Sequence, residues 1–232
     1  MDLQDKVAVI TGASKGIGKA IALQLLDKGV LVFGLSRSNP EIDHDNFNFI
    51  KTDVRSFEQV ESAFRQVFLA SNDQIHVVIN NAGLGYFGYI EDHTLDQWHT
   101  MYETNVNSIF YTSKLAVPVM KQQQYGHIVN IASTAGLEGY PQVSGYCGSK
   151  FAVKGISQSM YKEMRDDRIK VTCVYPGSVK TEFFRNSNID PHDYMLMPED
   201  VAEMIVWALE SPDNFHQVNL EVRPLQPKGP KK

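Results

Sequence analysis

Short apolar runs alternate with amphipathic stretches along most of the chain. The runs, typical of buried strands, lie at residues 6–10, 30–35, 47–50, 75–79, 126–133, 169–174 and 214–223. Apolar residues at helical spacing follow several of them, at about 19–28, 57–70, 101–122, 145–164 and from 198 onward. Alternation of strand and helix predicts parallel pairing and right-handed crossovers. We therefore expect one α/β domain with a doubly wound parallel sheet of about seven strands and helices on both faces.

Composition narrows the class of protein. The 232 residues, 43% hydrophobic and 21% charged, suit a single globular domain with a sizeable core. A net charge of −5 gives no reason to expect a nucleic acid partner. We expect no membrane association, because no run approaches the roughly 18 apolar residues of a span and the N-terminus is too polar for a signal peptide. Neither a cysteine pairing pattern nor a metal-ligand cluster is visible, so we expect a cytoplasmic protein without a metal site.

A glycine-rich turn lies between the first predicted strand and the first predicted helix. It carries Gly12, Ser14, Lys15, Gly16, Ile17 and Gly18. Glycines let a backbone approach a pyrophosphate closely, and a helix N-terminus offers free N–H groups and positive potential. Because the turn directly joins a strand to a helix, it predicts a site for a nucleotide phosphate.

A phenol and an ammonium are predicted to share one helix face, since Tyr146 and Lys150 are four residues apart. A free phenol titrates near pH ~10. The nearby cation is expected to lower the pKa of Tyr146 toward neutrality and make it an acid–base catalyst. Ser133 ends an apolar strand, at the edge where ligands of open α/β sheets bind. Tyr and Lys at this spacing are also common on ordinary helices.

Five motifs occur in the order of one known family. They are Thr11-Gly12 with Gly16 and Gly18, the segment 80–83 (Asn-Asn-Ala-Gly), Asn105, Ser133 with Tyr146 and Lys150, and Pro176-Gly177. The chain thus resembles the short-chain dehydrogenase/reductase family over about residues 5–182. The resemblance implies a Rossmann-type sheet of order 3-2-1-4-5-6-7 in a single domain of residues 1–232. Its cofactor-binding part would cover about 5–125 and its catalytic and substrate part about 126–225.

The resemblance also implies roles for individual residues. Asn105, Ser133, Tyr146 and Lys150 would be catalytic, with Asn105 interrupting its helix and holding a water of the proton relay. Lys150 would also hold the nicotinamide ribose. Asp53 would bind the adenine amino group, Val54 would line its pocket, and Val179 and Thr181 would bind the nicotinamide carboxamide. The remaining implied cofactor contacts, beyond Tyr146 and the glycine turn, are Asn80, Ala82, Gly83, Pro176 and Gly177.

The second strand ends without the acid that an NAD site usually places about 20 residues after the glycine turn. Ser36 stands there and Arg37 follows it. A guanidinium can bind a 2′-phosphate, which a carboxylate would repel. Lys15 adds a second cation on the same side. We therefore expect NADP (NADPH) as the cofactor, although both cations could be ordinary surface residues.

Several readings stay open. Residues 84–98 either form a substrate wall or pack on the next helix, and the apolar loop 182–197 is either a substrate lid or a core connection. His76 is expected to be structural, and Asp53 could simply cap the helix at 57–70. Gly148 departs from the Ala or Ser usual in the family. Residues 217–224 replace a glycine-rich segment that helps build tetramers in the family, which argues against a tetramer. The resemblance implies that the helices at about 101–122 and 145–164 pair across a two-fold axis, so a homodimer or a homotetramer is expected.

Taken together, the sequence predicts an oxidoreductase acting on a small carbonyl or alcohol substrate. Hydride would pass between the nicotinamide and a ketone or secondary alcohol, with Tyr146 as the general acid/base. A nucleotide-binding regulator is the alternative, but it would not need Asn105, Ser133, Tyr146 and Lys150 together. The sequence does not choose among 3-oxoacyl thioesters, steroids, pteridines, sugars and other ketones.

Overall fold

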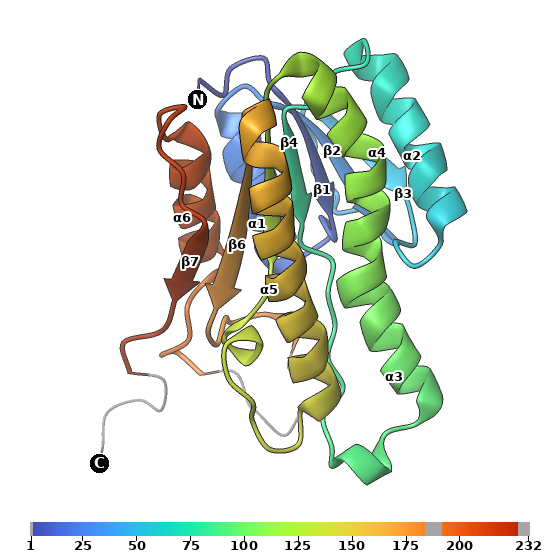
Figure 1. The fold of residues 1–232 in the computed structure, drawn as a ribbon, viewed down its shortest axis with the longest axis vertical. Coiled ribbons are helices and arrows are strands. Elements are labelled where there is room, and N and C mark those ends of the chain that lie inside the picture. The colour runs from blue at the N-terminus through green and yellow to red at the C-terminus, as the bar shows by residue number, and fades with distance from the viewer. Residues whose placement is uncertain (1, 184–191, 227–232) are drawn as a thin grey trace.

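The computed structural model describes residues 2–183 and 192–226. Its strands form one sheet of seven in the order β3-β2-β1-β4-β5-β6-β7 (Figure 1), and every neighbouring pair is parallel. The strands are β1 (Val7–Thr11), β2 (Leu31–Ser36), β3 (Phe47–Lys51), β4 (Val77–Asn80), β5 (Gly126–Ile131), β6 (Ile169–Pro176) and β7 (Asn219–Val222). The predicted Rossmann-type sheet and its strand order are confirmed.

Helices cover both faces of the sheet. One face packs against α1 (Gly16–Asp27) and α6 (Pro198–Glu210), which also contact each other. The other face packs against α2 (Phe57–Ser71), α4 (Ser108–Gln123) and α5 (Ser144–Met164). The central strands are buried on both sides, which explains their continuous apolar runs. No helix in the described part of the chain is long and apolar enough to cross a membrane.

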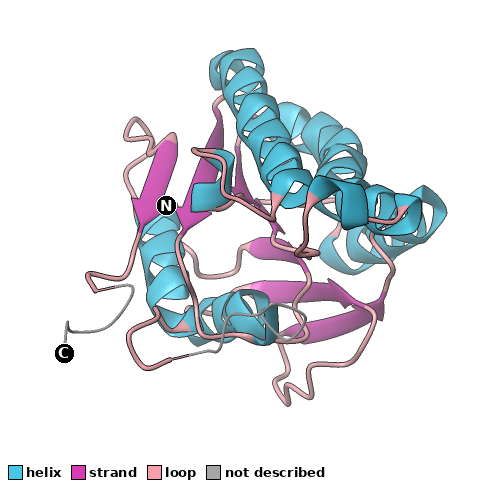
Figure 2. Cartoon of the chain, turned by 90° about the horizontal axis from the view of Figure 1, so that it is seen from below, coloured by secondary structure: helices cyan, strands magenta, loops and turns pink. Residues whose placement is uncertain are grey.

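All strands end at the same edge of the sheet, the lower edge in Figure 1, which Figure 2 shows from below. This common direction follows from parallel pairing. It brings the segments after β1, β2, β4, β5 and β6 to one side of the molecule. Those segments carry most of the residues that the sequence predicts to be functional.

The long helix predicted over 101–122 is interrupted. The structure has α3 (Leu95–Tyr102), then a π-helical turn (Glu103–Asn107), then α4. The break contains Asn105, as the family resemblance implies. Apolar periodicity could not reveal the break, because helical residues continue on both sides of it.

Two other boundaries differ from the predictions. Helix α1 begins at Gly16 and not at residue 19, because the glycine turn itself supplies the first helical residues. The last strand is limited to Asn219–Val222, whereas 214–223 was predicted.

His76 has a structural partner, since its Nδ1 accepts a hydrogen bond of 3.1 Å from the Val7 amide. The basic tail at 228–232 lies outside the described residues.

A chain of buried hydrogen bonds crosses the centre of the sheet. Asn80 on β4 donates from Nδ2 to Asn130 Oδ1 at 2.8 Å, and its own Oδ1 accepts from Thr112 of α4 at 2.7 Å. Asn130 on β5 donates to Ser157 Oγ of α5 at 2.9 Å. Buried polar groups of this kind are costly unless each is paired. The network therefore fixes α4 and α5 against the two central strands.

Candidate active site

The glycine turn is packed so tightly that side chains do not fit. Gly12 and Gly16 have φ values of +68° and +57°, which favour glycine. A Cβ on Gly18 would lie 2.3 Å from the Gly12 carbonyl oxygen and 2.4 Å from Asn81 Nδ2. Asn81 Nδ2 donates to the carbonyls of Thr11 and Gly12, at 3.0 Å each. Asn81 thus ties the turn to the end of β4, a role that sequence reasoning did not assign to it.

The N-terminus of α1 has the features of a phosphate site. Lys15, at the N-cap position, makes no side-chain cap, and no acidic residue occupies the first turn. The bare backbone of the glycines leaves the N–H groups accessible to an anion. Ser14 and Ile17 are partly buried beside them. The turn therefore fits the pyrophosphate of a dinucleotide.

Lys15 is not the free cation that the sequence suggested. Its Nζ is ion-paired with Glu182, a residue 167 positions further along the chain. This pairing reduces the charge that Lys15 offers to a 2′-phosphate. Arg37 is exposed directly after β2, whereas Ser36 is buried and donates from Oγ to the Ser38 carbonyl at 2.8 Å. Arg37 is thus the better placed cation for a 2′-phosphate.

Asp53, after β3, is held by its own neighbour. The Arg55 guanidinium donates to both carboxylate oxygens, from Nη2 to Oδ2 at 2.7 Å and from Nε to Oδ1 at 3.0 Å, and this hydrogen bonding lowers the pKa of Asp53. Arg37 adds a weaker electrostatic effect in the same direction. The cap of α2 is Ser56, whose side chain accepts from the Gln59 amide. Asp53 is therefore not the cap, and buried Val54 lies next to it.

The segment after β4 approaches the predicted catalytic residues. Ala82 donates from its amide to Thr11 Oγ1 at 3.1 Å. A Cβ on Gly83 would lie 3.4 Å from both Asn105 Oδ1 and Lys150 Nζ. The side chain of Asn80 is used in the buried network described above, which leaves only its backbone to face a cofactor.

Tyr146 and Lys150 lie on α5 as predicted, and both are buried, with exposed fractions of 9% and 4%. Lys150 Nζ donates to the carbonyl oxygen of Ile131, the last residue of β5, at 2.8 Å, and lies 5.7 Å from the centroid of the Tyr146 ring. No carboxylate partner for Lys150 is present in the described part of the chain. Its burial lowers the pKa of Lys150 to about 8.

The prediction that Lys150 lowers the pKa of Tyr146 is wrong. Burial raises the pKa of Tyr146 to about 12, and a hydrogen bond from Ser133 only partly opposes this. Loss of hydration is the largest cause of the rise, and the Lys150 ammonium is bound to the Ile131 carbonyl and not to the phenol. Tyr146 therefore keeps its proton at neutral pH. Ser133, after β5, accepts from the Ala135 amide at 3.2 Å.

Asn105 is fully enclosed by protein partners. Its amide group exchanges two hydrogen bonds of 2.9 Å with the backbone of Leu84 and donates a third, also of 2.9 Å, to Ser149 Oγ on α5. Its side chain thus joins the π-helical turn, the segment after β4 and α5. That it also positions a water remains a prediction.

The segment after β6 packs onto the glycine turn. A Cβ on Gly16 would lie 3.2 Å from Thr181 Cγ2. Val179 pairs with Leu196 in a parallel bridge, in which the flanking Ser178 and Lys180 make the hydrogen bonds. When the two neighbours of a residue make the hydrogen bonds of a parallel bridge, the N–H and C=O groups of that residue point away from the partner segment. The backbone of Val179 is therefore directed away from Leu196, as a contact to a carboxamide requires.

Aromatic and apolar side chains surround Tyr146. Its ring lies 5.3 Å from that of Phe183, which in turn contacts Phe87 edge to face at 6.0 Å. Leu84, Tyr86 and Val143 pack on the same cluster. Residues 84–87 therefore line the surroundings of the phenol and also pack on neighbouring elements. The prediction that 182–197 forms a lid rests mainly on residues 184–191, which include Phe184 and lie outside the described residues.

Gly148 has a local explanation. A Cβ at this position would meet the hydroxyl of Tyr102, on α3, at 2.6 Å. Glycine at this position, where the family usually has Ala or Ser, therefore leaves room for the Tyr102 side chain. Both cysteines, Cys147 and Cys173, are buried and free.

Comparison with known proteins identifies the family. The family model described as short chain dehydrogenase matches residues 6–192. An uncharacterized oxidoreductase of Staphylococcus aureus (strain MRSA252) is 34% identical over 231 residues, covering 96% of this chain and 99% of the relative. The chain therefore belongs to the short-chain dehydrogenase/reductase family and is an oxidoreductase of that family.

Two solved structures have the same fold. The closed form of serine dehydrogenase complexed with NADP+ has a TM-score of 0.87 at 27% identity, covering 95% of each chain. An alcohol dehydrogenase from the archaeon Thermococcus sibiricus, complexed with 5-hydroxy-NADP, has a TM-score of 0.87 at 28% identity. It covers 99% of this chain and 100% of its own.

Gly18→Ala should destabilise the protein by about 1–3 kcal/mol, because its Cβ would collide with the backbone of Gly12. Gly155→Ala is the control. Gly155 lies on α5 with nothing within 4 Å of an added Cβ, so this change should stabilise by about 0.5–1 kcal/mol. Urea unfolding of the two variants measures both effects. Equal stability of Gly18→Ala and the wild type would contradict the packing described for the turn.

Proposed function

We propose that the protein is an NADP(H)-dependent oxidoreductase that transfers a hydride between nicotinamide and a ketone or secondary alcohol. The observation that carries the proposal is the meeting of three groups after β5. The Tyr146 hydroxyl interacts with Ser133, and Lys150 is buried beside the phenol with its ammonium on the last carbonyl of the strand. A proton donor, a second hydroxyl and a buried cation suit a reaction in which a carbonyl oxygen gains negative charge.

In the reducing direction, Tyr146 donates its proton to the developing alkoxide. A pKa of about 12 keeps the phenol protonated before the reaction. Ser133 accepts a hydrogen bond from Ala135, and its single proton, which bonds the Tyr146 oxygen, turns to the substrate oxygen in this proposal. A bound nicotinamide cofactor would supply or accept the hydride. Apolar side chains around the phenol, including Phe183, keep water away from it.

Lys150 holds both the catalytic helix and the cofactor in this proposal. One of its three protons is used by the Ile131 carbonyl, which leaves two to donate to ribose hydroxyls. Asn105 binds Leu84 and Ser149 and so fixes both next to Lys150. By the family resemblance, it also positions a water that refills the proton chain.

The same proposal assigns the remaining cofactor contacts. The glycine turn with Ser14 and Ile17 binds the pyrophosphate, Asp53 and Val54 the adenine, and Arg37 with Lys15 the 2′-phosphate. The backbones of Asn80, Ala82 and Gly83 face the adenosine side, while Pro176, Gly177, Val179 and Thr181 bind the nicotinamide. The serine and alcohol dehydrogenases with bound NADP+ or 5-hydroxy-NADP support a preference for a phosphorylated dinucleotide. We further infer a single domain over 1–232 and a cytoplasmic location.

Tyr146→Phe should abolish turnover while leaving cofactor binding intact, because only the proton donor is removed. General acid catalysis supplies ~10²–10⁴ in rate, so kcat should fall at least that far. A screen of ketones that follows NADPH absorbance provides the assay, and fluorescence titration provides the NADPH affinity. Tyr125→Phe, which removes a hydroxyl just before β5, is the control and should keep activity. Near wild-type turnover of Tyr146→Phe would refute the mechanism.

Arg37→Asp should reverse the cofactor preference from NADPH to NADH. The change removes a charge-assisted contact and adds repulsion, which together should shift the ratio of kcat/KM values by about 10- to 100-fold. Arg165→Asp alters an exposed Arg at the C-terminal end of α5 and should leave the ratio unchanged. A wild-type enzyme that prefers NADH would contradict the assignment.

We expect a homodimer or homotetramer in which α4 and α5 pair across a two-fold axis. Both helices expose a large apolar side chain, Phe110 on α4 and Phe151 on α5. Sedimentation equilibrium at micromolar concentration should give at least twice the chain mass of 26.1 kDa. A single species of the monomer mass would refute the expectation.

A further inference from the structure

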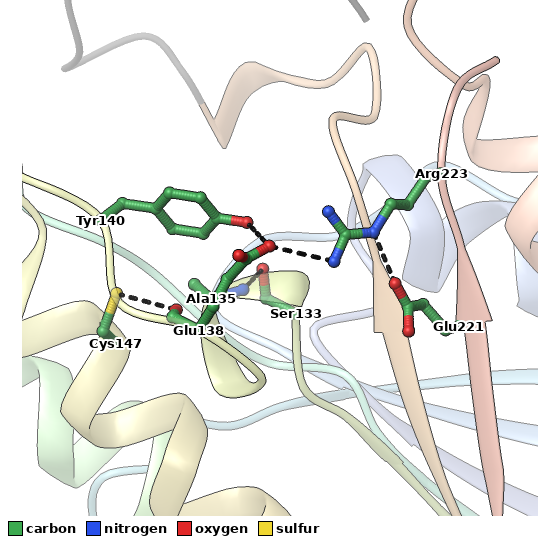
Figure 3. A network of polar contacts seen from close by, with 7 residues as sticks. All are labelled: Ser133, Ala135, Glu138, Tyr140, Cys147, Glu221 and Arg223. Atoms are coloured by element: carbon green, nitrogen blue, oxygen red, sulfur yellow. Dashed lines mark hydrogen bonds and ion pairs between the residues drawn. The ribbon is translucent and has the colours of Figure 1, made fainter.

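An ion pair joins the end of the last strand to the segment that follows Ser133 (Figure 3). Arg223, the first residue after β7, donates from Nη2 to Glu138 Oε1 at 3.1 Å. Its Nε donates to Glu221 Oε1 at 2.5 Å. The Tyr140 hydroxyl donates to the same oxygen of Glu138, also at 2.5 Å. One guanidinium thus connects two carboxylates that are far apart in the sequence.

Glu138 occupies a central place between two proposed catalytic residues. It belongs to the segment 137–143, which connects the short 3₁₀ turn after Ser133 to the start of α5. Its carbonyl oxygen accepts a weak hydrogen bond from Cys147 Sγ at 3.9 Å, and Cys147 is the neighbour of Tyr146. This contact places the backbone of Glu138 next to the helical turn that carries the phenol.

Other contacts hold mainly the two ends of this segment, where Leu137 and Val143 pack on neighbouring apolar clusters. The Glu138 amide donates to the Thr134 carbonyl at 3.2 Å, and the Gln142 carbonyl accepts from the Gly88 amide at 2.8 Å. Glu138, Gly139 and Tyr140 are all exposed, and nothing lies within 4 Å of an added Cβ on Gly139. The carboxylate of Glu138 is thus a principal anchor for the middle of the segment.

Arg223 is itself anchored on the segment that we propose binds nicotinamide. The Gly177 amide donates to the Val222 carbonyl at 2.7 Å, and a Cβ on Gly177 would lie 3.3 Å from Arg223 Cα. The side chain of Arg223 then reaches across to Glu138. It connects the segment after β6 with the segment after β5, which are the two sides of the proposed catalytic centre.

We infer that Arg223 and Glu138 are positioning residues, whose ion pair fixes the segment 137–143 so that a carbonyl substrate is oriented toward Tyr146. The inference rests on the proposed function. It assigns to the C-terminal strand a role in substrate orientation that is separate from cofactor binding. Arg223 acts through Glu138, and its contact with Glu221 does not reach the segment.

The chain offers a matched control for this inference. Glu138 and Glu221 both bind Arg223, and their side chains are similarly exposed, at 52% and 46%. Glu138→Gln and Arg223→Gln each weaken the link to the segment. Glu221→Gln weakens the other contact of the same guanidinium and leaves the link in place.

Amide hydrogen exchange of the full chain tests the positioning directly. Glu138→Gln and Arg223→Gln should each accelerate exchange in 137–143 by about threefold to fivefold, the range that an exposed ion pair can supply. The double variant should be no faster than either single one, because both changes remove the same contact. Glu221→Gln should exchange like the wild type. Unchanged exchange in the first two variants, or an equal effect in Glu221→Gln, would overturn the inference.

Kinetics with NADPH and ethyl acetoacetate, a neutral ketone, tests the consequence for the substrate. Glu138→Gln and Arg223→Gln should lower kcat/KM for the ketone about threefold to fivefold, because a misoriented substrate reacts more slowly with Tyr146, with the Kd for NADPH close to wild type. An unchanged kcat/KM for the ketone, or weaker NADPH binding, would reject the inference. Failure of the wild type to reduce any ketone would instead reject the proposed function, and the exchange experiment would still decide the positioning.

Discussion

Parallel pairing of all seven strands is the constraint on which the rest of the structure depends. Parallel strands must return to the same starting edge through a crossover, so each strand delivers its following segment to the opposite edge. The glycine turn, the segment after β4, Ser133 and the segment after β6 meet there for this reason. The cost is a sheet whose central strands are buried on both faces, so buried side chains such as Asn80 and Asn130 find hydrogen-bond partners within the protein.

The same lack of water sets the protonation states around α5. Burial acts in opposite directions on the two titratable groups, because it disfavours the charged form of each. The pKa of Lys150 falls to about 8, so part of the amine is uncharged near neutral pH. The pKa of Tyr146 rises to about 12, so the phenol keeps its proton there. At a pKa of about 12 the phenol holds its proton firmly, so it gives the proton up only to a more basic oxygen such as a developing alkoxide.

The sequence predicts those features that depend on local spacing. Strand order follows from the family resemblance, and the four-residue spacing correctly puts Tyr146 and Lys150 on one helix. Features that depend on distant partners could not be predicted. Glu182 reaches Lys15 from 167 residues away, and Lys150 prefers a backbone carbonyl to the phenol. The direction of the pKa shift of Tyr146 was therefore missed, since it depends on burial and not on spacing.

The π-helical turn at Glu103–Asn107 has a consequence for how the chain tolerates insertions and deletions. A π-turn holds one more residue than an α-helical turn, and each residue of an α-helix rotates the following face by about 100°. Deleting one residue there would favour a continuous helix but turn α4 relative to α3. Thr112 would leave Asn80, and Asn105 would leave Leu84, although no residue in contact with either had been changed. This protein should therefore not tolerate insertions or deletions at Glu103–Asn107, between α3 and α4, and should tolerate them better in its surface segments.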